Sequence, residues 1–383
     1  MTRVIKADSF FYPYEERKGG YLEIVDGKFG DWLAELPAGA EVLDYTGYSI
    51  APGLVDTHIH GFGGADVMDD STEAIEIMSA GLPSTGVTSY LPTTLTSTSE
   101  RLDSVCKKIA QVKDAPGAKI RGIYFEGPYF TEEFKGAQNP AYMNNPSIEE
   151  FEKWQSSAEG LISKIALAPE REGVAEFVDY VTQQGVVVAM GHSNATYDEA
   201  RAAVQAGASV WVHAYNGMRG LNHREPGMVG AMYNIPHTYA ELIADGHHVC
   251  QKACEILIQQ KNHDHIALIT DCMRAGGMPD GNYMLGEFPV IVKDGAARLE
   301  HNPASLAGSI LKLYQGMKHV HDWGIANREE AVRMASLIPA ISCKIDDKCG
   351  QIKKGYEADF IVLNPDLSLA ATYIDGVKVF EAE

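Results

Sequence analysis

Two histidines stand one residue apart at the end of an apolar run. They are His58 and His60 in the string GLVDTHIHGFGG, which spans residues 53–64 and becomes glycine-rich after the second histidine. Alternate side chains of a β-strand point to the same face, so a strand here would aim both imidazoles into one space. Two imidazoles on one face can bind a metal ion, but they can also be hydrogen-bonded histidines near a barrel mouth. The pair alone leaves both interpretations open.

Other apolar runs along the chain also end in polar residues that can bind a metal. Six of the eight runs that we interpret as strands end in histidine or carboxylate. Besides His58 and His60, the residues at these ends are Glu126, His192, His213, Asp245, His247, His248 and Asp271. A single such ending means little, because polar residues often begin loops. Their repetition predicts a metal site, and imidazole with carboxylate but no thiolate suits Zn²⁺, Fe²⁺, Mn²⁺ or Co²⁺.

These residues need a scaffold that brings strand ends together. The eight strand-like runs lie at 53–60, 87–91, 120–126, 162–168, 186–192, 209–213, 239–245 and 265–271, and helical segments separate them. This alternation predicts an α/β fold of the (β/α)8 TIM-barrel type, in which chemistry lies at the C-terminal ends of the strands. A doubly wound sheet is the competing arrangement, but no G-x-G-x-x-G string follows an early strand.

Local signals mark some of the helix boundaries. Asp70 with Glu73 three residues later resembles a capping box, and Ser147 with Glu150 has the same spacing. Gly207 follows the helical string TYDEARAAVQA and is a typical helix terminator. We therefore expect helices to start at the first two sites and one helix to end at the third.

The two ends of the chain differ from the middle and resemble each other. Both consist of short strand-like runs, with Asp-Gly hairpin signals at 26–27 and 375–376. We therefore expect a small β-sandwich domain built from both termini, residues 1–52 and 349–383. The catalytic barrel would then comprise residues 53–348.

The charge and hydropathy of the chain exclude several classes of partner. The 32 basic and 52 acidic residues give a formal charge of −20, which argues against binding to nucleic acid or to an anionic membrane. A small anionic substrate remains possible, because a few local cations can outweigh the overall field. No apolar run approaches the roughly 18–20 residues of a membrane span, and no signal-peptide pattern opens the chain. We expect a cytoplasmic protein with reduced cysteines.

The strand-end residues together resemble the amidohydrolase superfamily. Longer strings extend the likeness over the whole chain: APGLVDTHIHG, GIYFEGPYF, KGAQNP, GHSNAT, HAYNGMRGLNHREPG, IADGHHV, TDCMRAGGMPDG, LAGS and GYEADFIVLN. They resemble the branch of that superfamily that deacetylates N-acetylglucosamine 6-phosphate. The resemblance implies metal-dependent hydrolysis of the acetamide, which releases glucosamine 6-phosphate and acetate.

The resemblance also assigns roles to the strand-end residues. It implies that Glu126, His192 and His213 bind the principal metal, and that His58 and His60 can hold a second, with Glu126 as the bridge. One or two divalent ions are expected per chain, most often Zn²⁺ or Fe²⁺. Asp271 would be the general base and acid. Many amidohydrolases bridge their metals with a carboxylated lysine, but Lys164 lies near the start of its strand, which fits Glu126 taking that part.

For the substrate, the resemblance implies contacts from several loops. The residues concerned are Ala137, Gln138, Asn216, Gly217, Arg224, His248, Leu306, Ala307 and Gly308. Arg224 is the best local cation for the phosphate. Many relatives carry histidine where this chain has Gln138, which puts a phosphate contact there in doubt. Relatives are commonly homodimers with a phosphate contact across the interface, so we expect a homodimer and Arg224 or a neighbour as that contact.

Two alternative functions stay open on the sequence alone. One is a different amidohydrolase, acting on a related amino-sugar phosphate or on a cyclic amide. The glutamate at position 126 argues against the lysine-bridged cyclic amidases. The other is a catalytically silent relative that serves as a binding scaffold. Such proteins tend to lose metal ligands, and here no ligand is missing from the pattern.

Overall fold

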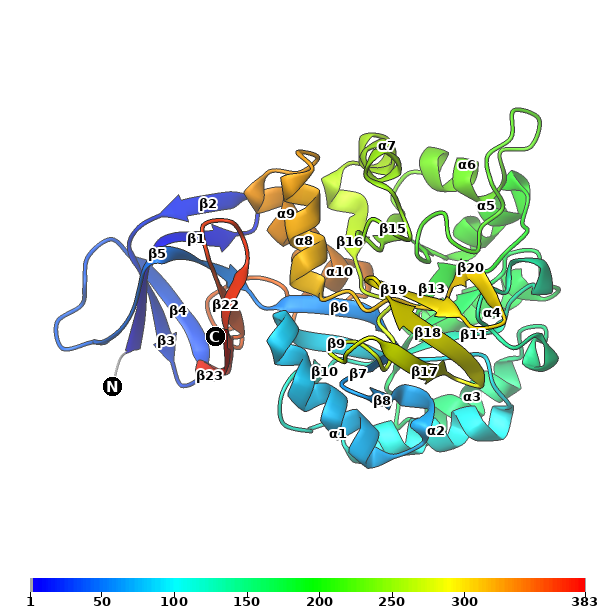
Figure 1. The fold of residues 1–383 in the computed structure, drawn as a ribbon, viewed down its shortest axis with the longest axis horizontal. Helices are drawn as coiled ribbons and strands as arrows, with labels where there is room; N and C mark the ends of the chain where they lie inside the picture. The colour runs from blue at the N-terminus through cyan, green and yellow to red at the C-terminus, as the bar shows by residue number, and fades with distance from the viewer. Residues whose placement is uncertain (1–2, 383) are drawn as a thin grey trace.

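The computed structural model describes residues 3–382 and contains a nearly closed barrel of eight parallel strands. In their order around the barrel these are β6 (Leu54–Ile59), β9 (Val87–Thr94), β11 (Ile123–Tyr129), β12 (Ile162–Leu167), β13 (Val187–Met190), β14 (Val210–Trp211), β15 (Tyr239–Leu242) and β16 (Ile266–Leu268). Backbone hydrogen bonds from Asp271 to His58 and from His60 to Cys272 join the chain after β16 to β6. The predicted α/β barrel is confirmed, and Figure 1 shows it on the right.

Helices surround the barrel and bury apolar side chains. They are α1 (Thr72–Gly81), α2 (Ser99–Gln111), α3 (Ile148–Ser157), α4 (Val174–Gln183), α5 (Tyr197–Ala206), α6 (Gly227–Asn234), α7 (Gln251–Lys261), α8 (Leu313–Asp322), α9 (Arg328–Ala335) and α10 (Leu337–Ser342). Helix α2 is typical: it buries Leu102, Val105, Cys106 and Ile109, which recur every three or four residues. Within residues 3–382 no helix is long and apolar enough to cross a membrane.

Short 3-10 turns link several elements, and one of them overturns a predicted helix start. The turns are η1 (Val67–Asp69), η2 (Leu82–Thr85), η3 (Glu132–Phe134), η4 (Pro140–Tyr142) and η5 (His263–His265). Asp70 does not cap α1, since it adopts a left-handed conformation at the end of η1 and Ser71 takes the cap position. Ser147 does cap α3, with its hydroxyl accepting from the Glu150 amide at 3.2 Å. Gly207 ends α5 as expected.

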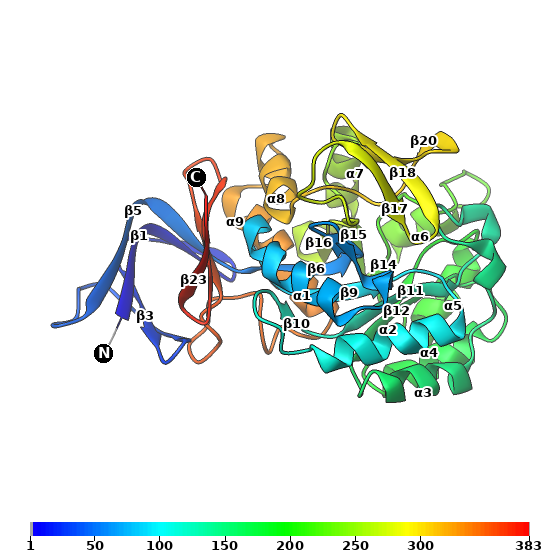
Figure 2. The ribbon, with the colours of Figure 1, turned by 60° about the horizontal axis from the view of Figure 1, so that its bottom comes forward.

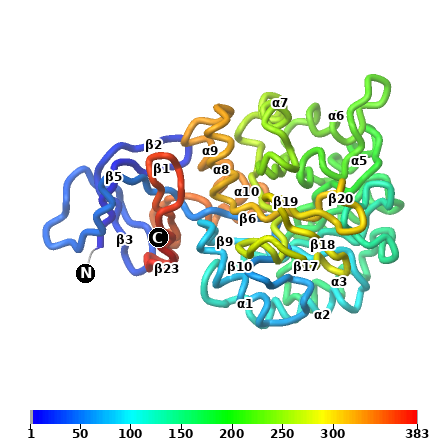
Figure 3. Tube along the Cα trace, in the orientation of Figure 1, coloured from blue at the N-terminus to red at the C-terminus, as the bar shows by residue number. Residues whose placement is uncertain are grey.

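The strands of both termini share one mixed sheet beside the barrel. Its order is β23 (Val377–Glu381), β22 (Leu369–Ile374), β21 (Phe360–Leu363), β5 (Glu41–Pro52), β1 (Arg3–Tyr12), β3 (Tyr21–Val25) and β4 (Lys28–Leu33), with β2 (Glu15–Lys18) paired to β1. Tight turns at 26–27 and 375–376 join β3 to β4 and β22 to β23, as predicted. The sheet forms a sandwich-like domain, in which blue and red segments meet in Figure 3. The exact boundaries of the two domains stay a prediction.

A four-stranded antiparallel sheet was not expected from the sequence. It consists of β17 (Gly281–Leu285), β18 (Phe288–Lys293), β19 (Ala296–Leu299) and β20 (Asn302–Leu306), inserted between β16 and α8. Figure 2 shows this sheet, in yellow, at one end of the barrel. A smaller hairpin, β7 (Gly61–Phe62) with β8 (Ala65–Asp66), and the short strand β10 (Lys119–Ile120) complete the fold. The inserted sheet therefore covers the end of the barrel where the strand-end residues lie.

A charged cluster connects the barrel to the sandwich-like domain. The ammonium of Lys119 lies 2.8 Å from Glu357, 3.0 Å from Asp359 and 2.7 Å from Asp375. Arg121 adds a second cation to Glu357. Burial raises the pKa of Asp359, so this carboxylate depends on its cationic neighbours to stay charged. The cluster should therefore contribute to the stability of the contact between the two domains.

We predict that Lys119→Met lowers the free energy of unfolding by about 1–3 kcal/mol, because the buried Asp359 loses the nearer of its two cationic partners, Lys119 and Arg121. Denaturant unfolding followed by tryptophan fluorescence measures this change. Lys113→Met is the matched control, since Lys113 pairs with Glu159 only at the exposed surface. The control substitution should lower the free energy of unfolding by less than about 1 kcal/mol. Equal losses in the two variants would contradict the role of the cluster.

Candidate metal and substrate site

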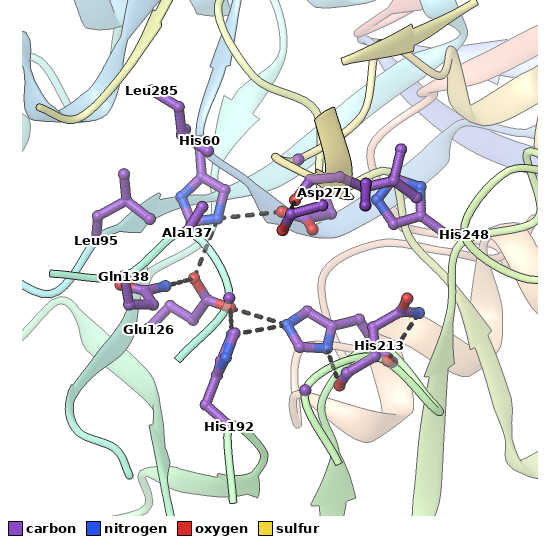
Figure 4. Close-up of a pocket in the computed structure, with 17 residues that line it drawn as sticks. His60, Leu95, Glu126, Ala137, Gln138, His192, His213, His248, Asp271 and Leu285 are labelled. Atoms are coloured by element: carbon purple, nitrogen blue, oxygen red, sulfur yellow. Dashed lines mark hydrogen bonds and ion pairs between the residues drawn. The ribbon is translucent and has the colours of Figure 1, made fainter. Parts of the chain in front are cut away.

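The first group of possible metal ligands consists of Glu126, His192 and His213. Glu126 lies within β11, His192 and His213 follow β13 and β14, and all three side chains are buried. The Oε1 atom of Glu126 lies 3.2 Å from Nε2 of His192 and 3.1 Å from Nε2 of His213. One ligand atom from each residue lies within 4.8 Å of the others. Figure 4 shows the three side chains pointing toward one another.

The backbone fixes how the two rings of this group point. Nδ1 of His192 lies 2.8 Å from the carbonyl of Phe134, and Nδ1 of His213 lies 3.1 Å from the carbonyl of Asn216. Each Nδ1 therefore carries the proton, and each Nε2 offers a lone pair toward Glu126. Gly217 is needed here, because a Cβ at its positive φ would come within 2.9 Å of the His192 ring. The rings are thus positioned before any ligand binds.

The second group consists of His58, His60 and Asp271. Nε2 of His60 lies 3.2 Å from Asp271 Oδ1 and 3.3 Å from Glu126 Oε2. Nε2 of His58 lies 3.5 Å from both Glu126 Oε1 and Asp271 Oδ1, and it is a buried atom without a hydrogen-bond partner. Buried polar atoms normally have partners, so an unpaired imidazole nitrogen among carboxylates fits a metal ligand. Together the two groups fit a site for two metal ions with Glu126 between them.

Electrostatics keep both acids of the site in the charged form. Burial alone would raise the pKa of Glu126, but the close approach of the His192, His213 and His58 imidazoles holds it well below its usual range. Burial also opposes ionisation of Asp271, and the neighbouring His58 and His60 side chains outweigh that effect and lower its pKa. A carboxylate that stays ionised can bind a cation or accept a proton.

Three site residues adopt backbone conformations that are uncommon without glycine. The φ angles are +46° at His192, +26° at His213 and +50° at Asp271. Residues other than glycine seldom adopt positive φ, and such strain concentrates at functional sites. Each of these residues stands where a barrel strand gives way to a loop. The turn re-aims the side chain from the strand direction toward the common centre.

A cavity of about 260 Å³ opens over both groups. Of the predicted substrate residues, seven line it: Ala137, Gln138, Asn216, Gly217, His248, Leu306 and Gly308. The cavity is also lined by five residues that no motif in the sequence indicates: Leu95, Gly136, Leu285, Ala304 and Ser305. Leu285, Ala304 and Ser305 belong to the inserted sheet, whose approach no local pattern in the sequence indicates. His248 is fixed by Asp245, which lies 2.6 Å from its Nδ1 atom.

Two predicted substrate residues do not line the cavity. Ala307 lies between two lining residues but is fully buried, and its amide donates to Ala297. Arg224 is exposed on the loop before α6 and lies outside the cavity lining. A contact between Arg224 and a ligand in this cavity would therefore need a second copy of the chain or a loop movement.

Gln138 lines the cavity, but its side-chain amide points to Glu126. Its Nε2 donates to Glu126 Oε2 at 2.5 Å, and its Oε1 accepts from the Thr96 amide at 2.8 Å. The Thr96 amide fixes which end of the side-chain amide points to the carboxylate. The role of Gln138 in this structure is to hold the Glu126 oxygen nearest His60.

Comparison with known proteins identifies the family. The model of the amidohydrolase family matches residues 49–379. The chain belongs to the amidohydrolase family. It is 41% identical over 335 residues, 87% of this chain and 83% of the relative, to N-acetylglucosamine-6-phosphate deacetylase of Vibrio furnissii. It is also 37% identical to N-acetylgalactosamine-6-phosphate deacetylase of Escherichia coli O157:H7, over 98% of this chain and 99% of the relative.

A solved structure extends the similarity to three dimensions. It is an aspartate-to-alanine mutant of N-acetyl-D-glucosamine-6-phosphate deacetylase from Mycobacterium smegmatis in complex with N-acetyl-D-glucosamine 6-phosphate. The TM-score is 0.93 at 30% identity, with 99% of both chains covered. The predicted resemblance to the sugar-phosphate deacetylase branch of the amidohydrolases is therefore confirmed.

We predict that the two ligand groups lose metal independently. His58→Ala combined with His60→Ala should remove the second metal ion and leave the first bound, because Glu126, His192 and His213 are unchanged. His192→Ala should instead weaken the first ion. Elemental analysis of purified protein after exhaustive dialysis measures both. Loss of all metal in the first variant would contradict two separable sites.

Proposed function

We propose that this enzyme hydrolyses the acetamide of N-acetylglucosamine 6-phosphate to glucosamine 6-phosphate and acetate. The observation that carries the proposal is the pair of buried ligand groups joined at Glu126 beneath a cavity. Seven residues that the sequence resemblance assigned to the substrate line that cavity. The substrates named for the Vibrio furnissii relative and for the Mycobacterium smegmatis structure agree with this choice.

Asp271 is placed to move the protons of this reaction. Its Oδ1 atom lies 3.2 Å from His60 and 3.5 Å from His58, beside the space where the metal ligands converge. A divalent metal bound there would lower the pKa of water toward about 7 and polarise the amide carbonyl. Asp271 then accepts a proton from the water that attacks the carbonyl carbon. It passes that proton to the amine nitrogen as the carbon–nitrogen bond breaks, leaving acetate and the amino sugar.

The loops after the strands would bind the sugar phosphate. His248 is held through Nδ1 by Asp245, so its Nε2 atom is left for a hydroxyl or phosphate oxygen. Asn216 and Gly217 bring backbone to the cavity wall next to His192. The exposed Arg224 suits a phosphate contact made across a homodimer interface, where its guanidinium can meet two phosphate oxygens. We infer a homodimer on this basis.

A second candidate substrate is N-acetylgalactosamine 6-phosphate. The Escherichia coli relative named for it matches this chain over nearly its whole length, including the inserted sheet. The two sugars differ only in the configuration of one hydroxyl, at C4, so the same metal chemistry serves both. Discrimination would depend on the cavity walls, not on the strand-end ligands.

We predict a substrate preference that a panel of four sugars can measure. The 6-phosphates of N-acetylglucosamine and N-acetylgalactosamine are compared with the two unphosphorylated sugars, and released acetate is followed. N-acetylglucosamine 6-phosphate should give the highest kcat/KM, by at least tenfold over its free sugar, because charged hydrogen bonds to phosphate are lost without it. A preference for the galacto sugar would select the second candidate. Equal rates with and without phosphate would refute both.

We predict that Asp271→Asn lowers kcat by about 10²–10⁴-fold, since an amide cannot accept the proton of the attacking water. Substrate binding should persist, because the amide keeps the size and position of the carboxylate. Steady-state kinetics and isothermal titration with substrate measure the two effects. The metal ion held by Glu126, His192 and His213 should remain, which serves as the control for folding. Turnover within a few-fold of the parent enzyme would remove Asp271 from this role.

A further inference from the structure

A buried ion pair lies inside the barrel beneath the metal ligands, and none of the roles described so far uses it. Lys164 on β12 and Glu241 on β15 contact each other with side chains that are 1% and 0% exposed. Burying two charges costs solvation energy that their attraction only partly offsets, and apolar replacements are often equally stable. Stability alone therefore gives a weak reason for this pair.

Glu241 connects the two ligand groups. Its Oε1 atom pairs with Lys164, and its Oε2 atom lies 3.0 Å from Nδ1 of His58. The same Oε2 atom accepts from the backbone amide of His213 at 3.2 Å. His58 belongs to the second group and His213 to the first, so one carboxylate oxygen holds a residue of each.

The contact between Nδ1 of His58 and Glu241 determines which ring nitrogen of His58 can bind a metal ion. A carboxylate acceptor at Nδ1 keeps the proton on that nitrogen, so the lone pair resides on Nε2. Nε2 is the atom that faces Glu126 and Asp271 and has no hydrogen-bond partner. The ring is thus fixed in the tautomer and orientation that a metal ligand needs.

His58 differs from the other three histidines of the site in this contact. Nδ1 of His60 lies 3.1 Å from the carbonyl of Thr93, and Nδ1 of His192 and of His213 likewise faces a backbone carbonyl. His58 alone among the four has a carboxylate there. A charged acceptor makes the imidazole a stronger ligand than a carbonyl does.

Lys164 fixes the glutamate in turn. Its ammonium donates to Glu241 and to the carbonyl of Thr57, and it lies 4.0 Å from the ring centre of Tyr124. The Tyr124 ring packs edge-on against the His58 ring at 4.9 Å. These contacts leave Glu241 one arrangement, with Oε1 toward the lysine and Oε2 toward His58.

We propose that Lys164 and Glu241 are positioning residues that set the tautomer and ring orientation of His58 and thereby form the second metal site. Through the His213 amide, Glu241 also ties this site to the first. The proposal deepens the proposed function, since it concerns the same centre. It is tested by metal binding without substrate, so a wrong substrate assignment would leave its outcome unaffected.

The test removes both charges at once, because a single change would leave the other charge buried and unpaired. Lys164→Met with Glu241→Leu takes away the acceptor, whereas Lys164→Met with Glu241→Gln keeps a carbonyl oxygen for Nδ1. The variant with methionine at 164 and leucine at 241 should lose the second metal ion and keep the first, as we expect for His58→Ala with His60→Ala. The variant with methionine at 164 and glutamine at 241 should retain both ions, with the second ion bound about 10–100-fold more weakly than in the parent enzyme.

Three measurements are made on each purified variant. Elemental analysis counts metal, titration with Zn²⁺ or Co²⁺ gives each affinity, and thermal unfolding checks the fold. In the Co²⁺-loaded protein, the exchangeable Nδ1 proton of His58 should give a paramagnetically shifted NMR signal. That signal should disappear in the variant with leucine at position 241.

Asp56→Asn is the matched control. Asp56 is a buried carboxylate on β6, two residues before His58, and it accepts from the Thr270 hydroxyl at 2.6 Å. It contacts the backbone amide of His58 but not the ring. This variant should keep both metal ions.

Several outcomes would overturn the proposal. Unchanged affinity for the second ion in the methionine–leucine variant would show that His58 needs no carboxylate. Equal loss of both ions, or loss of the second ion in Asp56→Asn as well, would show a general effect of altering the barrel core. A parent enzyme that binds only the first ion under every condition would refute it too.

Discussion

The charge of one buried carboxylate, Glu126, determines how the rest of the site is built. Four imidazoles surround it, and their Nε2 atoms lie within 3.5 Å of its oxygens. An isolated charge at this depth would be costly, so its neighbours must donate to it or a cation must bind it. The barrel meets this requirement because the C-terminal ends of parallel strands converge. Segments far apart in the chain thereby reach a common centre.

The parts of the fold that the sequence predicts are those with a local pattern. Strand alternation and polar strand ends predict that His58, His60 and Asp271 share one end of the barrel, and the structure brings the three together there. Ser147 caps its helix as its spacing indicates. Asp70 does not cap α1, because it ends the preceding 3-10 turn in a left-handed conformation and Ser71 takes the cap position. Local spacing alone does not carry that information.

The remainder of the site depends on partners that are distant in sequence. Glu241 interrupts an apolar strand, which is a visible signal, but Lys164 stands 77 residues earlier and His58 183 residues earlier. No spacing rule links them. Gln138 is similar: the sequence marks its loop, but only the Thr96 amide shows that the side chain turns to Glu126. The strands of the inserted sheet pair with their neighbours in sequence, but the position of this sheet over the cavity depends on contacts with distant parts of the chain.

Under the proposed function, this division between barrel and cavity walls would let the same chemistry serve different sugars. The two groups that fit a metal site arise from the barrel, where a shift in one strand would disturb its neighbours on both sides. The cavity walls arise from the loops around Ala137 and Asn216 and from the inserted sheet with Leu285 and Leu306. These segments can change without moving the ligands, because they pack on the barrel end and not within it. Under the proposed function, the walls would therefore set any preference for the gluco or galacto configuration, while Glu126 and its histidines stay the same.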